Sequence, residues 1–168
     1  MHLLEVRDLQ TVFQTDGKKI RAVNHVSFFT DPGEIVAFVG ESGSGKSVTQ
    51  MSILKLVEEP GKIVGGEVLY KGRNILAFDD DSPEMRKIRG GEIGMIFQEP
   101  MTSLNPVITI GKQITEMIAG HSDSSREKAL EKAIALLKSV GIPDAEKRIN
   151  DYPHQFSGGM RQRIMIAM

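Results

Sequence analysis

The chain has 168 residues, of which 40% are hydrophobic and 26% are charged, so it can bury a sizeable core and does not have the composition of a disordered protein. Its 21 Lys and Arg residues nearly balance 22 Asp and Glu, and a net charge of -1 argues against nucleic acid as a partner. The absence of cysteine excludes disulfides, thiolate catalysis and cysteine-bound zinc. No apolar run approaches the roughly 18 residues of a membrane-spanning helix, so we expect a soluble, unexported chain that reaches a membrane only through a partner.

The first part of the chain is predicted to be extended. Two such runs, 3–13 and 22–30, flank the turn residues 15–18, which is typical of a β-hairpin. Another turn signal, at 31–34, precedes the continuous apolar run 35–39. A run of this kind predicts a strand that is buried on both faces.

The next part mixes helix and strand signals. An apolar stripe predicts a helix over 47–57, and a short strand is predicted at 67–70. Ser82 followed by Pro83 predicts the start of a short helix that Gly90 and Gly91 end, with a further strand over 93–97. The acidic triplet 79–81 is interpreted as a solvated turn.

After Phe97 the remaining signals are mostly helical. Ser124 followed by Glu127 is a capping-box pattern that predicts a helix N-terminus, and Gly141 marks the C-terminus of the same helix. The final residues, 163–168, have the pattern of an apolar helix. The apolar stripe of the helix that begins near Ser124 is predicted to be Leu130, Ile134, Leu137 and Val140.

Residues 40–47 fit the phosphate-binding loop pattern G-x-x-x-x-G-K-[ST]. Gly40 and Gly45 would permit positive φ and close approach of the backbone, so that successive N–H groups turn toward phosphate oxygens. Lys46 would reach the β- and γ-phosphates, and Ser47 would offer its hydroxyl to Mg²⁺. The predicted nucleotide contacts in this loop are Gly40, Ser42, Gly43, Ser44, Gly45, Lys46, Ser47 and Val48. A chance Gly- and Ser-rich loop is the alternative, and the loop alone does not separate kinases, GTPases and motor ATPases.

Two further segments narrow the choice. Residues 156–163 resemble the signature sequence of ABC-type ATPases, and residues 96–100 resemble their Q-loop. The longer stretches 39–49, 97–106 and 152–159 are similar to the ATP-binding subunits of dipeptide, oligopeptide and nickel importers. The resemblance covers essentially the whole chain, from Leu3 to Met168.

The resemblance implies roles for residues outside the phosphate loop. Gln98 would act with Lys46 in catalysis, share Mg²⁺ with Ser47, and lie in the loop that contacts the membrane-spanning partner. A Ser beside two glycines at a helix start is a second anion site, and in the family Ser157, Gly158 and Gly159 close over ATP held by another subunit. Phe13 would stack on adenine, the alternative being an ordinary strand residue.

The resemblance also implies that the Walker B aspartate, the catalytic glutamate and the switch histidine would follow Met168. We therefore expect that these 168 residues alone hydrolyse ATP weakly or not at all, and that 35–39 exposes an apolar edge because a neighbouring strand is missing.

The sequence therefore predicts an α/β P-loop NTPase, an incomplete ABC-type nucleotide-binding domain. Residues 1–97 would form the P-loop core with N-terminal antiparallel strands, and 98–168 the Q-loop, helical subdomain and signature motif. The predicted function is that of the ATP-binding subunit of an importer for peptides or related small solutes, an ATPase that uses ATP and Mg²⁺ at the cytoplasmic face of the cell membrane.

The predicted partners are membrane-spanning subunits, a second ATP-binding subunit in a homo- or heterodimer and, indirectly, a solute-binding protein. One alternative is a truncated nucleotide-binding or interaction module without hydrolysis. A second alternative, a soluble ABC ATPase that works on nucleic acid or ribosomes, is disfavoured by the near-neutral charge.

Overall fold

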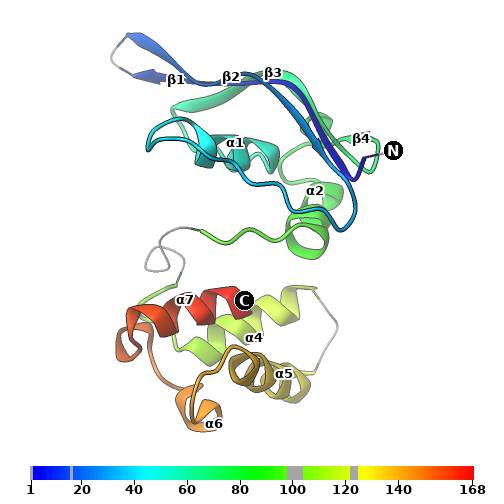
Figure 1. The fold of residues 1–168 in the computed structure, drawn as a ribbon. Helices are drawn as coiled ribbons and strands as arrows, with labels where there is room; N and C mark the ends of the chain where they lie inside the picture. The colour runs from blue at the N-terminus through cyan, green and yellow to red at the C-terminus, as the bar shows by residue number, and fades with distance from the viewer. Residues whose placement is uncertain (1, 16, 98–103, 122–124) are drawn as a thin grey trace. The chain divides into compact units, whose positions relative to one another are not determined.

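The computed structural model describes residues 2–15, 17–97, 104–121 and 125–168. It divides the chain into two compact units, Met1–Glu92 and Ile93–Met168, whereas the sequence suggests a division after residue 97 (Figure 1). The elements of the first unit are β1 (Leu4–Thr15), β2 (Lys18–Thr30), α1 (Lys46–Ile53), β3 (Gly61–Tyr70), β4 (Arg73–Asn74), the helical turn η1 (Ile75–Ala77), α2 (Pro83–Lys87) and the helical turn η2 (Ile88–Glu92). Those of the second unit are α4 (Ile110–His121), α5 (Arg126–Ser139), α6 (Ala145–Arg148), the helical turn η3 (Pro153–Gln155) and α7 (Gly158–Ala167).

The first unit is built on an antiparallel sheet with strand order β2-β1-β3-β4. The predicted hairpin is confirmed, since β1 pairs with β2 from Leu4 opposite Thr30 to Thr15 opposite Lys18. β3 pairs with the other edge of β1 and begins at Gly61, six residues before the predicted start at Glu67. Val6, Leu9 and other apolar residues of the sheet are almost fully buried.

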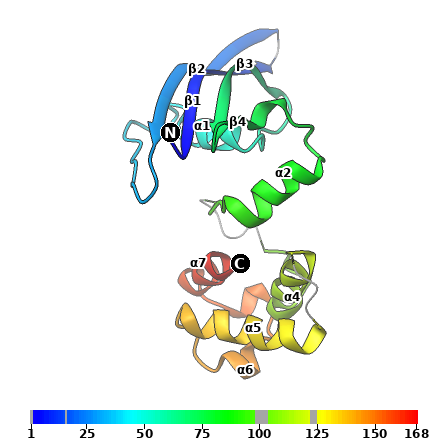
Figure 2. The same ribbon diagram turned by 90° about the vertical axis from the view of Figure 1, so that its right-hand side faces the viewer.

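Helix α1 packs against β1 and β2, on one face of the sheet (Figures 1 and 2). A buried hydrogen bond of 2.7 Å joins Thr11 Oγ1 on β1 to Ser52 Oγ on α1. Ser52 Oγ also donates to the carbonyl of Val48 at 2.6 Å, so the Thr11 hydroxyl is the donor in the bond between strand and helix. The helix is shorter than predicted, because it ends at Ile53 rather than at residue 57.

Two of the predicted strands are absent. Residues 35–39 are not paired with any strand, and the side chains of Ile35 and Val39 are each 95% exposed. Residues 93–97 are also unpaired, and Ile96 is 60% exposed. The apolar pattern predicts burial on both faces, but backbone pairing needs neighbouring strands, and the described residues supply none beside these two segments.

Helix α2 begins where the sequence predicts. Ser82 Oγ accepts a hydrogen bond from the N–H of Met85 at 3.2 Å, and Pro83 occupies the first helical position. The chain then continues through Gly90 and Gly91 as the wider turn η2 instead of ending at the two glycines. The acidic triplet is more than a solvated turn, because Asp80 forms an ion pair of 2.7 Å with Lys55.

The second unit is helical, with one apolar core. α4 contributes Ile110, Ile114 and Ile118 at a spacing of four residues, which places them on one side of the helix. The rest of the core comes from α5, α6, α7 and the loops, with the buried residues Leu104, Ala129, Ala133, Leu137, Ile142, Ala145, Ile149, Phe156 and Ile164.

Helix α5 differs from its prediction at the start. The residue that caps it is Ser125, whose Oγ accepts from the N–H of Lys128 at 3.5 Å, and the predicted cap, Ser124, lies outside the described residues. Of the predicted stripe, Leu137 is fully buried and Ile134 and Val140 pack against the core, but Leu130 is 43% exposed. The other buried residues of the helix are Ala129 and Ala133. The predicted end is confirmed, since Gly141 has φ 70° just after the helix.

Lys71 and Glu92 join the β3–β4 turn to the end of the first unit, with 2.6 Å between Lys71 Nζ and Glu92 Oε2. This hydrogen bond lowers the pKa of Glu92 below its ordinary value and raises the pKa of Lys71. The contribution to stability is therefore present above the ordinary carboxyl pKa and is lost as the pH falls through the lowered pKa of Glu92. We expect Lys71→Met to raise the pKa of Glu92 in an NMR titration, and an unchanged titration curve would contradict the pairing.

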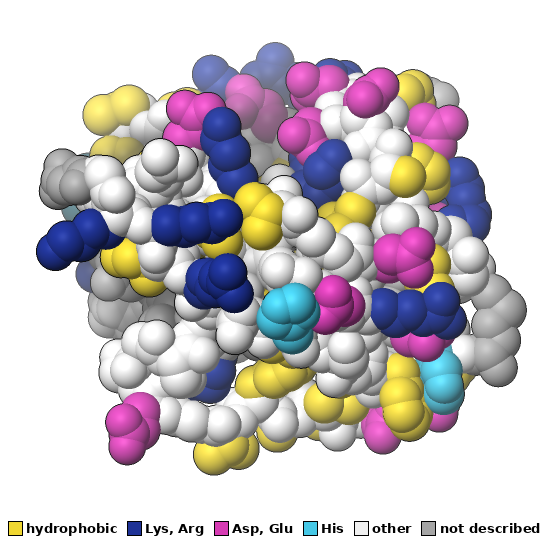
Figure 3. All heavy atoms as spheres, turned by 90° about the horizontal axis from the view of Figure 1, so that it is seen from above, with side chains coloured by type: hydrophobic (Ala, Val, Ile, Leu, Met, Phe, Trp, Pro, Cys, Tyr) yellow, Lys and Arg dark blue, Asp and Glu magenta, His cyan; other side chains and the backbone are white. Residues whose placement is uncertain are grey.

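None of the helices in the part of the chain that the structure describes has the length and hydropathy needed to cross a membrane. Seen from above, one face of the molecule carries Lys, Arg, Asp, Glu and hydrophobic side chains together (Figure 3). This mixture agrees with the near-zero net charge of the whole chain.

Candidate functional site

The P-loop pattern forms a loop that folds around the Lys46 side chain and leads directly into α1. Lys46 Nζ donates to the carbonyl of Gly40 at 2.8 Å and to that of Glu41 at 2.6 Å. It also lies 3.1 Å from Ser44 Oγ. The ammonium is thus directed into the concave side of the loop, where it can meet an anion.

Two glycines of the P-loop are required by their backbone conformation. Gly43 and Gly45 have positive φ values of 80° and 90°, which other residues adopt only with strain. Gly40 does not have a positive φ, contrary to the prediction. A Cβ at Gly40 would lie 2.9 Å from Ser44 Oγ, which is the end of a side chain that can rotate away.

The loop and the helix together form an anion site whose donors fit phosphate. The first N–H groups of α1 have no partner within the helix, and the helix dipole adds a partial positive charge at this end. No atom lies within 4 Å of the position that a Cβ on Gly43 would take, so the loop is open there. Lys46 adds a full positive charge, and this donor set is the one that a polyphosphate requires.

The other predicted contacts of the loop differ in exposure. Ser42 and Ser47 are exposed, so both hydroxyls are accessible to a ligand. Val48 is half-buried and belongs to the helix. Phe13 is half-buried on β1, opposite Ile20 on one side and Gly61 on the other.

The signature segment starts α7 in the second unit. Ser157 caps this helix, with Ser157 Oγ accepting from the N–H of Met160 at 3.4 Å. Ser157, Gly158 and Gly159 are all exposed, and a Cβ at either glycine would meet no atom within 4 Å. Phe156, just before them, is buried and anchors the segment in the helical core.

The structure therefore places the predicted residues in two groups. The P-loop residues and Phe13 belong to the first unit, and Ser157, Gly158 and Gly159 belong to the second. Gln98, the predicted catalytic and Mg²⁺-binding residue, lies outside the described residues. The roles of all these residues in binding and catalysis remain predictions.

The sequence profile of the ABC transporter family matches residues 23–168, which is most of the chain and includes the P-loop and the signature segment. The chain belongs to the ABC transporter family. The resemblance stated from the three motifs is thereby confirmed.

Relatives within the ABC transporter family carry names that refer to peptide transport. The chain is 53% identical over 167 residues to the oligopeptide transport ATP-binding protein OppD of Bacillus subtilis, covering 99% of this chain and 46% of that protein. It is 50% identical over 167 residues to the dipeptide transport ATP-binding protein DppD of Lactococcus lactis, covering 99% of this chain and 47% of the relative. The chain thus spans about half the length of the curated relatives it matches.

Solved structures confirm the fold of this ABC family member. A dimeric ATP-binding cassette in a post-hydrolysis state, bound to ADP and phosphate, superposes with a TM-score of 0.84 at 29% identity. The match covers 98% of this chain and 67% of that cassette. The cbiO1 protein of Clostridium perfringens, part of an ABC transporter complex, shares the fold with a TM-score of 0.72 at 22% identity, over 99% of this chain and 60% of that one.

Sequence reasoning missed two features around the P-loop. The carbonyl of Ala22 on β2 lies so close to Gly45 that a Cβ could not fit, and this contact joins residues far apart in the sequence. Arg89 binds the end of α1, although its segment was predicted only as the end of a short helix. No local pattern marks either residue.

Proposed function

We propose that this chain provides the ATP-binding part of an ATP-binding subunit of an ABC importer for peptides or related small solutes. The protein couples ATP binding and hydrolysis to uptake at the cytoplasmic face of the cell membrane. Its partners are membrane-spanning subunits and a second ATP-binding subunit, and a solute-binding protein acts indirectly.

The observation that carries the proposal is the P-loop around Lys46, in a chain that is about half identical to ATP-binding proteins named for oligopeptide and dipeptide transport. Lys46 and the N–H groups at the start of α1 would bind the β- and γ-phosphates. Among the residues that the structure describes, no group of three or more His, Asp or Glu could hold a metal ion. By the P-loop pattern, Ser47 would share Mg²⁺ with the phosphate oxygens of the nucleotide and with Gln98.

The remaining predicted residues complete the site. Phe13 would stack on the adenine, as a half-buried aromatic side chain of the unit that carries the P-loop. Ser157, Gly158 and Gly159 would bind the γ-phosphate of ATP held by a second subunit, because their helix start is exposed and has room for an anion.

Titration calorimetry with Mg-ATP tests the proposal. We expect binding by the chain and at least a roughly tenfold weaker affinity for Lys46→Ala, because the variant loses the only side-chain cation that the P-loop pattern supplies. Lys132→Ala removes an exposed lysine of α5 and is the matched control, for which we expect unchanged affinity. Equal affinities of all three proteins would contradict the proposed site.

Phosphate release, followed in the same samples, separates the proposed ATPase from a nucleotide-binding module that does not hydrolyse. The second candidate is favoured by the exposed apolar segment 35–39, which follows β2 and leads into the P-loop without a paired strand. ATP binding that depends on Lys46 but gives no phosphate release would support this second candidate for the chain on its own.

A further inference from the structure

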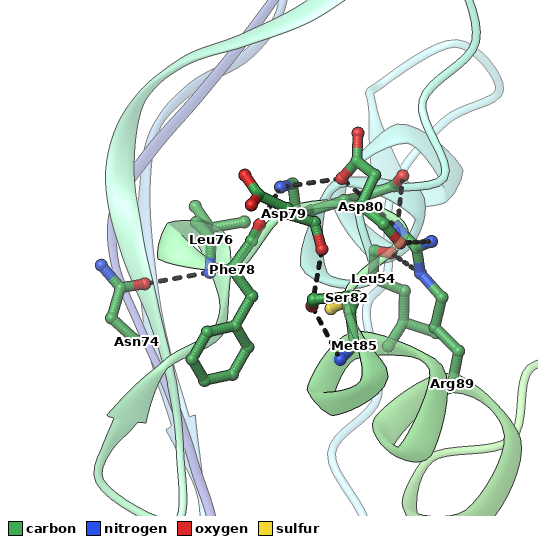
Figure 4. Close-up of polar contacts among 10 residues, drawn as sticks. Leu54, Asn74, Leu76, Phe78, Asp79, Asp80, Ser82, Met85 and Arg89 are labelled. Carbon is green, nitrogen blue, oxygen red and sulfur yellow. Dashed lines mark hydrogen bonds and ion pairs between the residues drawn. The ribbon is translucent and has the colours of Figure 1, made fainter.

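Arg89 connects the last turn of α1 to the loop before α2 (Figure 4). Its Nε donates to the carbonyl of Leu54 at 2.8 Å, and one terminal nitrogen donates to the carbonyl of Lys55 at 3.0 Å. The other terminal nitrogen donates to the carbonyl of Asp80 at 3.1 Å. One planar guanidinium thus binds three main-chain carbonyls, which an ammonium group could not do in the same geometry.

Two of the three contacted carbonyls, those of Leu54 and Lys55, lie at the C-terminal end of α1, and the third, that of Asp80, lies in the loop before α2. Carbonyls at the C-terminus of a helix have no intrahelical donor, and a cation there also interacts favourably with the helix dipole. The N–H groups of Leu56 and Lys55 bond to Met51 and Ser52, at 2.8 and 3.1 Å, and so use two other carbonyls of this end. Arg89 completes the cap of α1.

Lys55, whose carbonyl Arg89 binds, is itself held by contacts with the loop before α2. It has a φ of 53° without being glycine, which costs free energy unless other contacts hold it. Its ammonium donates to the carbonyl of Phe78 at 2.6 Å and pairs with Asp80 at 2.7 Å. Asp80 also lies 3.7 Å from Arg89, so one carboxylate joins both cations.

The two ends of α1 therefore make different contacts. The N-terminal end carries Lys46 and the loop that we propose binds phosphate, and the C-terminal end is held by Arg89. The helix has 8 residues, or about 12 Å at 1.5 Å per residue, so its two ends are separated by only about two helical turns. A shift of the loop when nucleotide binds would reach the Arg89 cap.

Arg89 also lies close to the C-terminal end of the first unit. It belongs to η2, whose last residue, Glu92, is the last residue of the unit, and the chain then enters the second unit at Ile93. The buried side chains of Ile88 and Met85 fix the neighbouring turns in the first unit. Arg89 thus ties the start of the segment that connects the units to the end of α1.

We propose that Arg89 is a positioning residue that transmits the nucleotide state of the P-loop, through α1, to the segment that connects the two units. The proposal rests on the proposed function, because it requires that the P-loop binds ATP. It gives Arg89 a role in conformational coupling and no contact with nucleotide.

Energy transfer between two fluorophores, one on each unit, tests the proposal. The chain has no cysteine, so Lys62→Cys on β3 and Lys132→Cys on α5 give two unique, exposed labelling sites. We expect Mg-ATP to change the transfer efficiency of the otherwise unaltered chain, and ADP to give a different value. Adding Arg89→Ala is expected to leave ATP affinity within about twofold while the ATP-dependent change falls by roughly half or more.

The outcomes distinguish coupling from stability and from ATP binding. An undiminished ATP response in a folded Arg89→Ala variant would overturn the proposal, and so would a parent chain that binds ATP without any change in transfer. If Arg89→Ala does not fold, Arg89→Lys decides, because it keeps the charge but cannot donate to the three carbonyls in the geometry of the guanidinium: a reduced response supports the role and an undiminished one overturns it. A folded parent chain that does not bind ATP would refute the proposed function itself, and this proposal with it.

Discussion

Replacing Ile114 by alanine is expected to lower the free energy of unfolding of the helical unit by about 2–5 kcal/mol. Ile114 is fully buried on α4, between Ile110 and Ile118 along the same side of the helix, and it belongs to the single core cluster of this unit. The substitution removes three carbon atoms from a packed interior and leaves a cavity that rigid neighbours fill only in part.

Urea unfolding followed by circular dichroism at the helical band measures this change, because the second unit is mostly helical. Leu130→Ala is the matched control: Leu130 lies on α5 in the same unit but is 43% exposed, so we expect a loss below about 1 kcal/mol. Equal losses for the two variants would show that the burial assigned to Ile114 is wrong.

In the helical unit, the sequence pattern predicted one helix end correctly, missed one helix and placed one helix start a residue too early. The end of α5 at Gly141 could be predicted because glycine has a specific advantage at positive φ. α4 was not predicted as a separate helix, although Ile110, Ile114 and Ile118 already form a readable stripe. The start of α5 was wrong by one residue because two serines adjoin, and only the hydrogen bond from Lys128 selects Ser125.

The segment 35–39 was wrongly predicted to be a strand, whereas the exposure of its apolar side chains agrees with the expectation that a neighbouring strand is missing. The continuous apolar run predicts that these side chains prefer a buried environment. A strand, however, also needs hydrogen-bond partners for its N–H and C=O groups. No described strand lies beside it, so Ile35 and Val39 are exposed and the backbone is irregular. An apolar pattern predicts that a segment prefers burial. It does not reveal whether the described chain contains a neighbouring strand that pairs with this segment.

In the candidate site, the features that follow from a local pattern could be predicted, and the contacts that depend on long-range packing could not. The P-loop pattern predicted the position of Lys46 and the positive φ of Gly45, because both follow from how a short loop must bind phosphate. The contacts of Arg89 with Leu54 and Lys55 could not be predicted, since they join residues that are 35 and 34 positions apart and depend on the packing of the whole unit.

Gly45→Ala is expected to weaken Mg-ATP binding by roughly a hundredfold, through two costs that act at the same residue. Gly45 caps α1 with φ 90°, so alanine there would be strained. Its Cβ would also collide with the carbonyl of Ala22, a main-chain group of β2 that is fixed by the sheet. The loop must therefore shift, and the N–H groups at the start of α1 then lose their alignment with the phosphates.

Gly43→Ala separates the two costs. Gly43 has a similar φ of 80°, but no atom lies within 4 Å of its Cβ position, so this variant carries the backbone strain without the collision. We expect roughly a tenfold loss of affinity for Gly43→Ala, measured by the same calorimetric titration. If both variants lose affinity equally, backbone strain alone explains the requirement for glycine. A larger loss for Gly45→Ala means that the fit of the P-loop against β2 also determines how well this chain binds nucleotide.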